Sequence, residues 1–385
     1  MRMSEEDVQK FLEVMRKRVG TITHLSIEDP NLFGRGLEVA TRDAIRTFVN
    51  GIGDTNPLYR SVDYARNTRY GGIIAPPTFL MAISQGTRRL AEERVTGFTA
   101  LIPGVDFEWF RTIHENDRIT AEETYMDPRD LGVKDGSRRL MEHYKRIYRN
   151  QKEEIVGIAD SGVFYIETDP YKEKLKTAQT GPTERYKYSK EELEAIDRAY
   201  EEEEIRGSNP RYWDEIIVGE KLKPIVKGPL THADVVAFFV GTAWFSEAFG
   251  IARKFLKKYP AWSYVDPDTN VMEWLSGIHM LEKIAQSRGI PMTFGLGDQM
   301  FCSAGSLLTN WIGDDGFLKK LSVRFDVPNW YGDTTWFKGE VTRKYVEKGQ
   351  GFVDIKLWAE DQKGVVHITG NATVILPARN LSTQE

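Results

Sequence analysis

Asp54 is placed where a carboxylate could take part in acid–base chemistry. It lies in the sequence GDTNPLY (residues 53–59), and Ala65 follows after five further residues. The Asn56-Pro57 step interrupts a helix, because the residue before a proline avoids the α region. A carboxylate at such a break can face a cavity, although the same tetrapeptide is also typical of a simple Asx turn.

His279 is the second candidate for proton transfer. Five residues separate it from Ala285, and the sequence PMTFG (residues 291–295) follows. Histidine suits this role because its ordinary pKa lies close to neutral pH. The alternative is a structural histidine near a helix start. The remaining histidines lie in cap or strand contexts and are expected to be structural: His24, His114, His143, His232 and His367.

The sequence GDTNPLY and the later Ala65 resemble the signature of the MaoC-like (R)-specific enoyl-CoA hydratases and (3R)-hydroxyacyl dehydratases. That signature reads Gly-Asp-x-Asn-Pro-Leu-His, then five residues, then Ala. The resemblance implies the hotdog fold, an antiparallel sheet wrapped round one long helix. In the family, the Asp and His hold the water that adds across the double bond, and a backbone N–H polarises the thioester carbonyl.

The first half of the chain departs from this signature at two positions. Tyr59 stands at the histidine position, and tyrosine is a poor base at neutral pH because its pKa is about 10. The loop at residues 72–77 aligns Pro76 with the family glycine, and proline has no N–H to donate. Losing one such donor costs about 2.7–4 kcal/mol of transition-state stabilisation. The first half therefore resembles a non-catalytic dehydratase subunit, in which Asn56, Tyr59 and Pro76 would line the acyl site.

The second half keeps other parts of the signature. The resemblance implies that His279 moves a proton, that the Gly295 N–H stabilises the enolate oxygen and that Phe294 lines the acyl site. The Gly-Asp step is missing, since the helix continues into Thr242-Ala243-Trp244. The acid must then come from elsewhere, and the candidates are Asp54 of the first half, Asp268, Asp266, Glu247 and Glu273.

Two segments with the same pattern of helix and strand signals are expected to position these residues. Thr41 and Thr231 each have the character of a helix N-cap, with apolar residues four and seven places further on. Residues 139–168 and 351–377 both read as antiparallel hairpins. We therefore predict an internal duplication in which each half is one long helix followed by several strands. Chance similarity is the alternative, but the order of elements and the turn chemistry repeat together.

The duplication fits the double-hotdog branch of the family, an α+β fold. The predicted units are an N-terminal hotdog at residues 1–170 and a C-terminal hotdog at residues 213–385. Residues 171–212 form a polar linker with a solvated helix capped by Ser189, with Glu192 at its third position. The central helix of the second half is predicted at residues 299–311.

Composition narrows the class of protein. The chain has 385 residues, a net charge of −5, 41% hydrophobic and 28% charged residues, which is ordinary for a globular protein. Its apolar runs are far shorter than the roughly 20 residues of a membrane span, so no membrane association is expected. The N-terminus has no secretory core, which favours the cytoplasm. One cysteine, Cys302, excludes an internal disulfide and a multi-cysteine metal site, and the mild acidity disfavours nucleic acid.

The functional prediction is the reversible hydration of a 2-enoyl thioester, either an acyl-CoA or an acyl carrier protein ester. No metal and no other cofactor are expected. One alternative is a hotdog thioesterase, in which a carboxylate activates water against the thioester carbon. Another is a catalytically silent acyl-binding subunit that needs a partner chain. A homodimer is also open.

Overall fold

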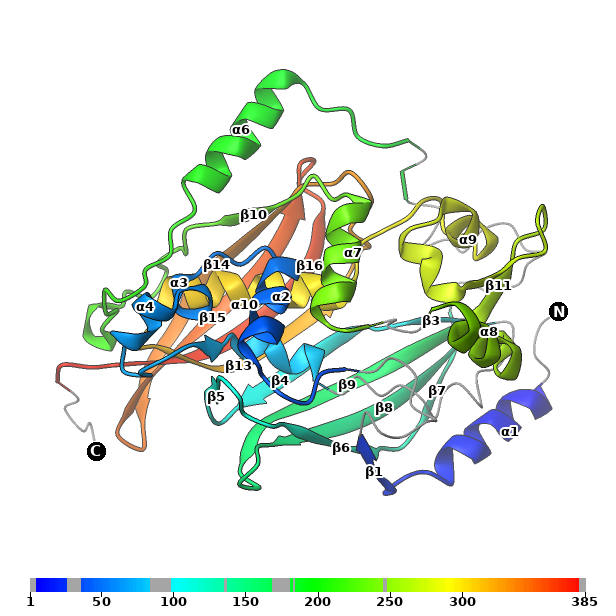
Figure 1. Cartoon of the computed structure of the whole chain (residues 1–385), viewed down its shortest axis with the longest axis horizontal. Coiled ribbons are helices and arrows are strands. Elements are labelled where there is room, and N and C mark those ends of the chain that lie inside the picture. Colours follow the sequence, from blue (N-terminus) through cyan, green and yellow to red (C-terminus); the bar gives the residue numbers. More distant parts are fainter. Residues whose placement is uncertain are drawn as a thin grey trace.

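One antiparallel sheet runs through both halves of the chain (Figure 1). The computed structural model describes residues 5–25, 36–83, 98–134, 137–167, 181–182, 184–244 and 248–380. The strands of the first half are β1 (Ile22–Leu25), β3 (Phe98–Leu101), β4 (Gly104–Trp109), β6 (Thr120–Tyr125), β7 (Arg129–Lys134), β8 (Ser137–Arg149) and β9 (Ile155–Glu167). Those of the second half are β10 (Ile225–Lys227), β13 (Phe317–Phe325), β14 (Thr335–Glu347), β15 (Gln350–Asp361) and β16 (Val366–Leu376).

The two halves meet at strands β4 and β13, which pair antiparallel at the centre of the sheet. Asp106 lies opposite Ser322, and Phe107 lies opposite Leu321. Outward from this pair, the order β4-β9-β8-β6-β1 in the first half is repeated as β13-β16-β15-β14-β10 in the second. The predicted duplication is therefore present in the strand order itself.

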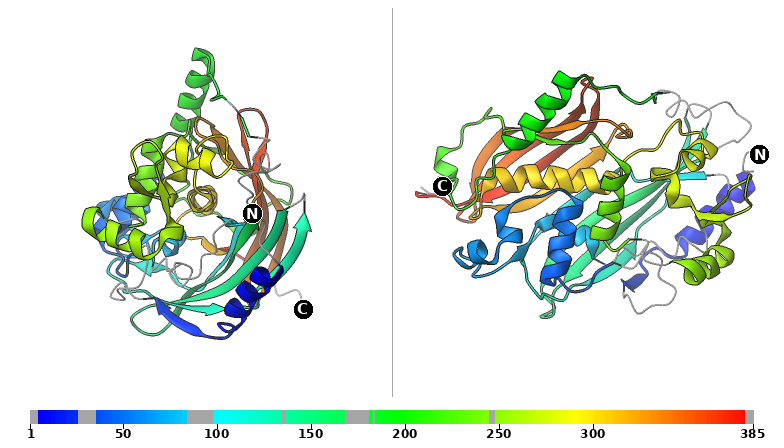
Figure 2. Two further views of the ribbon diagram at one scale, coloured as in Figure 1. Left: turned by 90° about the vertical axis from the view of Figure 1, so that its right-hand side faces the viewer. Right: turned by 45° about the horizontal axis from the view of Figure 1, so that its top comes forward.

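Helix α10 (Gly297–Ile312) lies on the concave side of the sheet, which curves around it (Figure 2). Every residue from 300 to 312 is buried, as is typical of a core helix. The helix predicted at residues 299–311 is confirmed, and it extends slightly further at both ends. An antiparallel sheet wrapped round a buried helix, with its strand order repeated once, confirms the predicted α+β double-hotdog fold.

The duplicated capped helices are α2 (Arg42–Gly51) and α7 (His232–Gly241). The side chains of Thr41 and Thr231 cap them as predicted. At ten residues each, they are shorter than the long helices expected at these positions. They pack against each other through glycine, because a Cβ on Gly51 would lie 2.6 Å from the Ala237 carbonyl oxygen and one on Gly241 would lie 3.0 Å from that of Thr47.

We expect Gly51→Ala to lower the free energy of unfolding by about 1–3 kcal/mol, the usual cost of overpacking a tight contact. The neighbouring atom is backbone and cannot rotate away. Chemical denaturation of both proteins measures the difference. Gly72→Ala is the control, because a Cβ there meets nothing within 4 Å, and its effect should stay within about 0.5 kcal/mol. Equal stabilities for the two variants would contradict the glycine contact.

The remaining elements surround this framework. Ser189 and Glu192 form the predicted capping box of the linker helix α6 (Lys190–Glu201), which packs against β10. None of the described helices has the length and apolar character to cross a membrane. The other helices are α1 (Glu5–Arg16), α3 (Pro57–Arg60), α4 (Val62–Arg66), η1 (Pro77–Ala82), η2 (Trp213–Glu215), α8 (Phe249–Lys258), η3 (Pro260–Trp262), η4 (Leu275–His279) and α9 (Glu282–Ser287), and the short strands are β2 (Ile74–Ala75), β5 (Ile113–His114), β11 (Ser263–Val265) and β12 (Met272–Trp274).

Candidate active site

His279 lies at the end of η4 between two aromatic side chains. Its ring centroid is 6.5 Å from that of Phe239 and 4.6 Å from that of Phe294. Nδ1 lies 2.9 Å from the Phe294 carbonyl oxygen, so Nδ1–H donates to this carbonyl and Nε2 carries the lone pair of the neutral imidazole. Burial lowers the pKa of His279 to about 4. The imidazole is therefore an uncharged base at neutral pH.

Gly295 follows directly, but its N–H is already used. It donates to the Asn329 carbonyl oxygen at 2.7 Å. The next N–H groups, at residues 296–298, precede the first hydrogen bond of α10, which Gln299 donates to the Leu296 carbonyl. The start of a helix presents N–H groups and partial positive charge to an anion. These three groups, and not the Gly295 N–H, are therefore the N–H groups of this helix start.

The helix starts also correct the predicted alignment of the two halves. Pro76 is the N-cap of η1, and Leu296 is the N-cap of α10. Ala75, rather than Pro76, is therefore the counterpart of Gly295. Since proline has no N–H, the first half has none at the position where the second half has the Leu296 N–H.

Asp54 is buried in the first half, with 2% of its surface exposed. Its Oδ1 accepts the Asn56 N–H at 2.9 Å, and its Oδ2 accepts the Ser306 hydroxyl at 2.8 Å. Asn56 in turn caps α3. Burial and the nearby Asp54 carboxylate raise the pKa of Tyr59 well above its usual value. Both carboxylate oxygens of Asp54 therefore hold structure, joining the break after α2 to helix α10.

A cavity of about 40 Å³ adjoins this part of the first half. It is lined by Asn56 and Tyr59 from the first half and by Thr309 and Asp314 from the second, among others. His279 is not among the residues that line it. The volume holds about three water molecules.

Trp244 occupies the place in the second half that Asp54 has in the first. The Asp54 N–H donates to the Val49 carbonyl after α2, and the Trp244 N–H donates to the Phe239 carbonyl after α7. The sequence comparison that aligned these two residues is confirmed. A carboxylate has thus been replaced by an indole at this position.

The acids considered for His279 lie elsewhere or outside the described residues. Asp268 is exposed in the β11–β12 turn and pairs with Lys283. Asp266 lies 3.6 Å from the same Lys283 amine. Glu273 lies in β12, and Glu247 is outside the described residues.

Asp54 is also separated from His279 by the length of α10. It contacts Ser306, nine residues after Gly297, which is about 13 Å along the helix axis. His279 contacts Phe294, three residues before Gly297. Two side chains at such different levels of the helix do not form one acid–base pair.

Asp298 is the acidic residue that sequence reasoning missed. It lies in the first turn of α10 and is 5% exposed. Burial raises its pKa to about 6, and the nearby Arg146 opposes this shift. A buried carboxyl whose pKa approaches neutrality is characteristic of functional sites. The available signal was an acid directly before the helix predicted to be central, at residues 299–311.

The comparisons with known sequences concern the first half. Residues 33–158 match the family model described as "FAS1-like, dehydratase domain region". A UPF0336 protein of Thermobifida fusca is 34% identical over 95 residues, and one of Streptomyces avermitilis is 30% identical over 98 residues. These matches cover 24% of this chain and 62% and 65% of the relatives. The chain thus spans less than two thirds of the length of these curated relatives.

Solved structures match nearly the whole chain. A MaoC-like dehydratase has a TM-score of 0.63 at 18% identity, covering 94% of this chain and 99% of its own. A MaoC domain protein dehydratase from Chloroflexus aurantiacus has a TM-score of 0.57 at 15% identity, covering 94% and 96%. A conserved Mycobacterium tuberculosis protein described as a double hotdog has a TM-score of 0.54 at 9% identity, covering 93% and 96%.

The strand order and these structural matches define a double-hotdog fold. Residues 33–158 thus resemble a dehydratase domain in sequence, and nearly the whole chain resembles the MaoC-like solved structures in fold.

Proposed function

We propose that the second half catalyses the reversible addition of water to a 2-enoyl thioester, with acyl-CoA as the substrate. The observation that supports this most strongly is the His279 imidazole. Its Nδ1–H is held by the Phe294 carbonyl, which orients the ring and leaves Nε2 as the base. The Phe294 segment leads directly into the start of α10, whose N–H groups suit an enolate oxygen.

In the hydration direction, Nε2 of His279 accepts a proton as the water oxygen bonds to C3. The electron pair of the C2=C3 bond moves to the thioester oxygen, which becomes an enolate stabilised by the N–H groups at residues 296–298. The enolate collapses as C2 takes the proton from the imidazolium. Asp298, when ionised, orients the water by accepting a hydrogen bond from its other O–H, and this hydrogen stays on the product hydroxyl.

The experiment is to incubate the purified chain with crotonyl-CoA and with longer 2-enoyl-CoA esters. We expect the absorbance of the conjugated thioester to fall while no free thiol appears. Release of free CoA would instead support the thioesterase alternative. An acyl carrier protein ester tested in parallel distinguishes the two carriers.

The two pKa shifts predict the pH dependence of kcat/KM. His279 is neutral above its lowered pKa of about 4, and Asp298 is ionised above its raised pKa of about 6. Both are in their basic forms only above about pH 6, so kcat/KM should fall as the pH drops through 6 and should be flat above it. In Asp298→Asn the acid limb should move toward pH 4. A wild-type limb already near pH 4 would contradict the role of Asp298.

The second candidate is a silent acyl-thioester-binding subunit. It is favoured by one observation, namely that none of the acids weighed for His279 contacts it within the described part of the chain. In that case the chain alone would bind an enoyl-CoA without turnover, and a partner chain would restore activity.

A further inference from the structure

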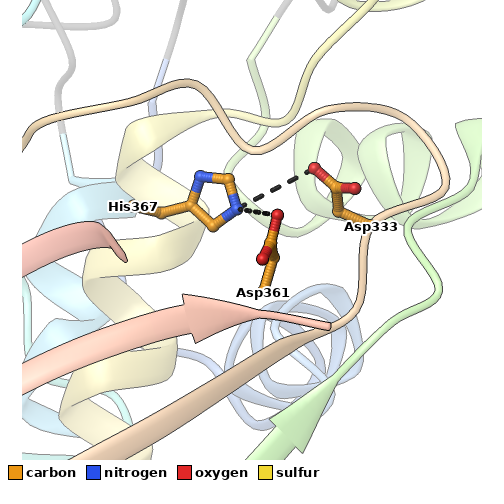
Figure 3. Close-up of side chains that lie close together, drawn as sticks. All are labelled: Asp333, Asp361 and His367. Carbon is orange, nitrogen blue, oxygen red and sulfur yellow. Dashed lines mark ion pairs between the residues drawn. The ribbon is translucent and has the colours of Figure 1, made fainter. Parts of the chain in front are cut away.

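Asp333, Asp361 and His367 come from three segments of the second half and face one another (Figure 3). Asp333 precedes β14, Asp361 ends β15, and His367 lies in β16. All three side chains are buried, and His367 has 0% of its surface exposed. We propose that these residues bind a divalent transition-metal ion, with Zn²⁺ as the best match.

The distances favour a bound ion over direct hydrogen bonds. Nε2 of His367 is 3.8 Å from Oδ2 of Asp333 and 3.7 Å from Oδ2 of Asp361. Both separations exceed the roughly 2.7–3.2 Å of an N–H···O hydrogen bond. Ligand atoms that are each bonded to zinc at about 2.0–2.2 Å stand about 3–4 Å apart.

The hydrogen bond of His367 also favours a bound metal ion. Nδ1 lies 3.2 Å from the Val327 carbonyl oxygen, so Nδ1–H donates to this carbonyl and Nε2 faces the two carboxylates. Nε2 is fully buried and has no hydrogen-bond partner among the described residues. A metal ion at this point would bind Nε2 and neutralise the two buried carboxylates together.

The first half provides an internal comparison at the hairpin turn. The Oδ1 atoms of Asn150 and Asp361 each accept the N–H groups two and four residues further on. An asparagine therefore closes the same turn, and the turn does not require the second carboxylate oxygen of Asp361. Six residues after each turn residue, the first half has the buried Val156 where the second has His367.

Asp333 of the cluster and the nearby Thr335 extend this comparison between the two halves. Asp117 and Asp333 both accept a glutamine amide from the hairpin turn, so they are counterparts. Thr335, opposite Asp361 in the sheet, has a buried hydroxyl with no hydrogen-bond partner among the described residues. Its counterpart two residues after Asp117 is the buried Ile119. The second half thus places ligating atoms at three positions where the first half has amide or apolar side chains.

One imidazole and two carboxylates suit a borderline divalent ion such as Zn²⁺ or Mn²⁺ better than Mg²⁺. Such an ion would join the segment before β14 to the β15–β16 hairpin. In the segment before β14, the Asn329 carbonyl accepts a hydrogen bond from the Gly295 N–H, and the Tyr331 N–H donates one to the Thr293 carbonyl. The ion would therefore stabilise the support beneath Phe294, the residue that orients His279.

The test is to strip the purified full chain with a chelator, remove the chelator, and titrate with Zn²⁺, Mn²⁺ and Mg²⁺. We expect one tightly bound Zn²⁺ per chain by elemental analysis. At free Zn²⁺ about a hundred times Kd, the melting temperature should rise by about 3–5 °C. Mg²⁺ should give neither effect.

The double variant Asp361→Asn/His367→Val carries the side chains of the first half and should fold but bind no Zn²⁺. Asp361→Asn alone keeps the turn and serves if the double variant does not fold. The control is His143→Gln/Asp160→Asn, which removes a His–Asp pair at the surface and should leave the bound Zn²⁺ unchanged. Less than about 0.2 equivalents on the wild type, or full binding by Asp361→Asn/His367→Val, would overturn the proposal.

Discussion

Replacing His279 with alanine is expected to reduce kcat for enoyl-CoA hydration at least about a hundredfold, the usual contribution of a general base. The variant removes Nε2 and also the Nδ1–H bond to the Phe294 carbonyl. Because the proposed acyl-binding groups are backbone N–H groups at residues 296–298, KM should change much less than kcat. Initial rates from the loss of conjugated-thioester absorbance measure both constants.

His24→Ala is the control for the histidine substitution. Its side chain is 78% exposed on β1, at the outer edge of the sheet. We expect rates within about twofold of the wild type. If His279→Ala retained its activity, the imidazole would be structural, and the silent acyl-binding subunit would become the better interpretation.

The largest expected effect on stability belongs to a buried ion pair in the first half. Arg146 Nε donates to Glu123 Oε2 at 2.6 Å, and both side chains are buried. Arg146→Ala would leave the Glu123 carboxylate buried without its partner. We expect the free energy of unfolding to fall by about 3–5 kcal/mol, measured by chemical denaturation.

Two further variants separate burial from simple charge pairing. Arg324 and Asp106 form an exposed pair at 2.7 Å, so Arg324→Ala should cost no more than about 1 kcal/mol. Arg146→Met combined with Glu123→Leu removes both charges and should recover most of the stability. If Arg146→Ala lowered the free energy of unfolding no more than Arg324→Ala does, the expected contribution of the buried pair would be contradicted.

The elements that local chemistry specifies could be read from the sequence. The caps at Thr41 and Thr231 depend on a hydroxyl followed by apolar residues at helical spacing, and both caps are present. The pairing of β4 with β13 could not be read, because it joins strands more than 200 residues apart. The contact of Gly51 with α7 also depends on tertiary packing, which helix periodicity does not specify.

In the candidate site, too, local sequence features could be predicted, whereas contacts that depend on tertiary packing could not. The spacing from His279 to Ala285 was enough to predict the imidazole as a candidate, because both residues lie on one short stretch of chain. The use of the Gly295 N–H could not be foreseen, since its acceptor, Asn329, is distant in the sequence. Asp298 was overlooked because an acid in the first turn of a helix is ordinary in a surface helix. Its burial becomes evident only when the sheet encloses α10.

The central pairing of Asp106 with Ser322 has an evolutionary consequence. In a homodimer, symmetry imposes every substitution on both subunits at once. Covalent fusion through one continuous sheet removes that constraint, so each copy can drift on its own. One copy has Asp54 with Tyr59, and the other has His279 with Trp244. Asymmetric divergence of this kind is open to a single polypeptide and closed to two identical ones.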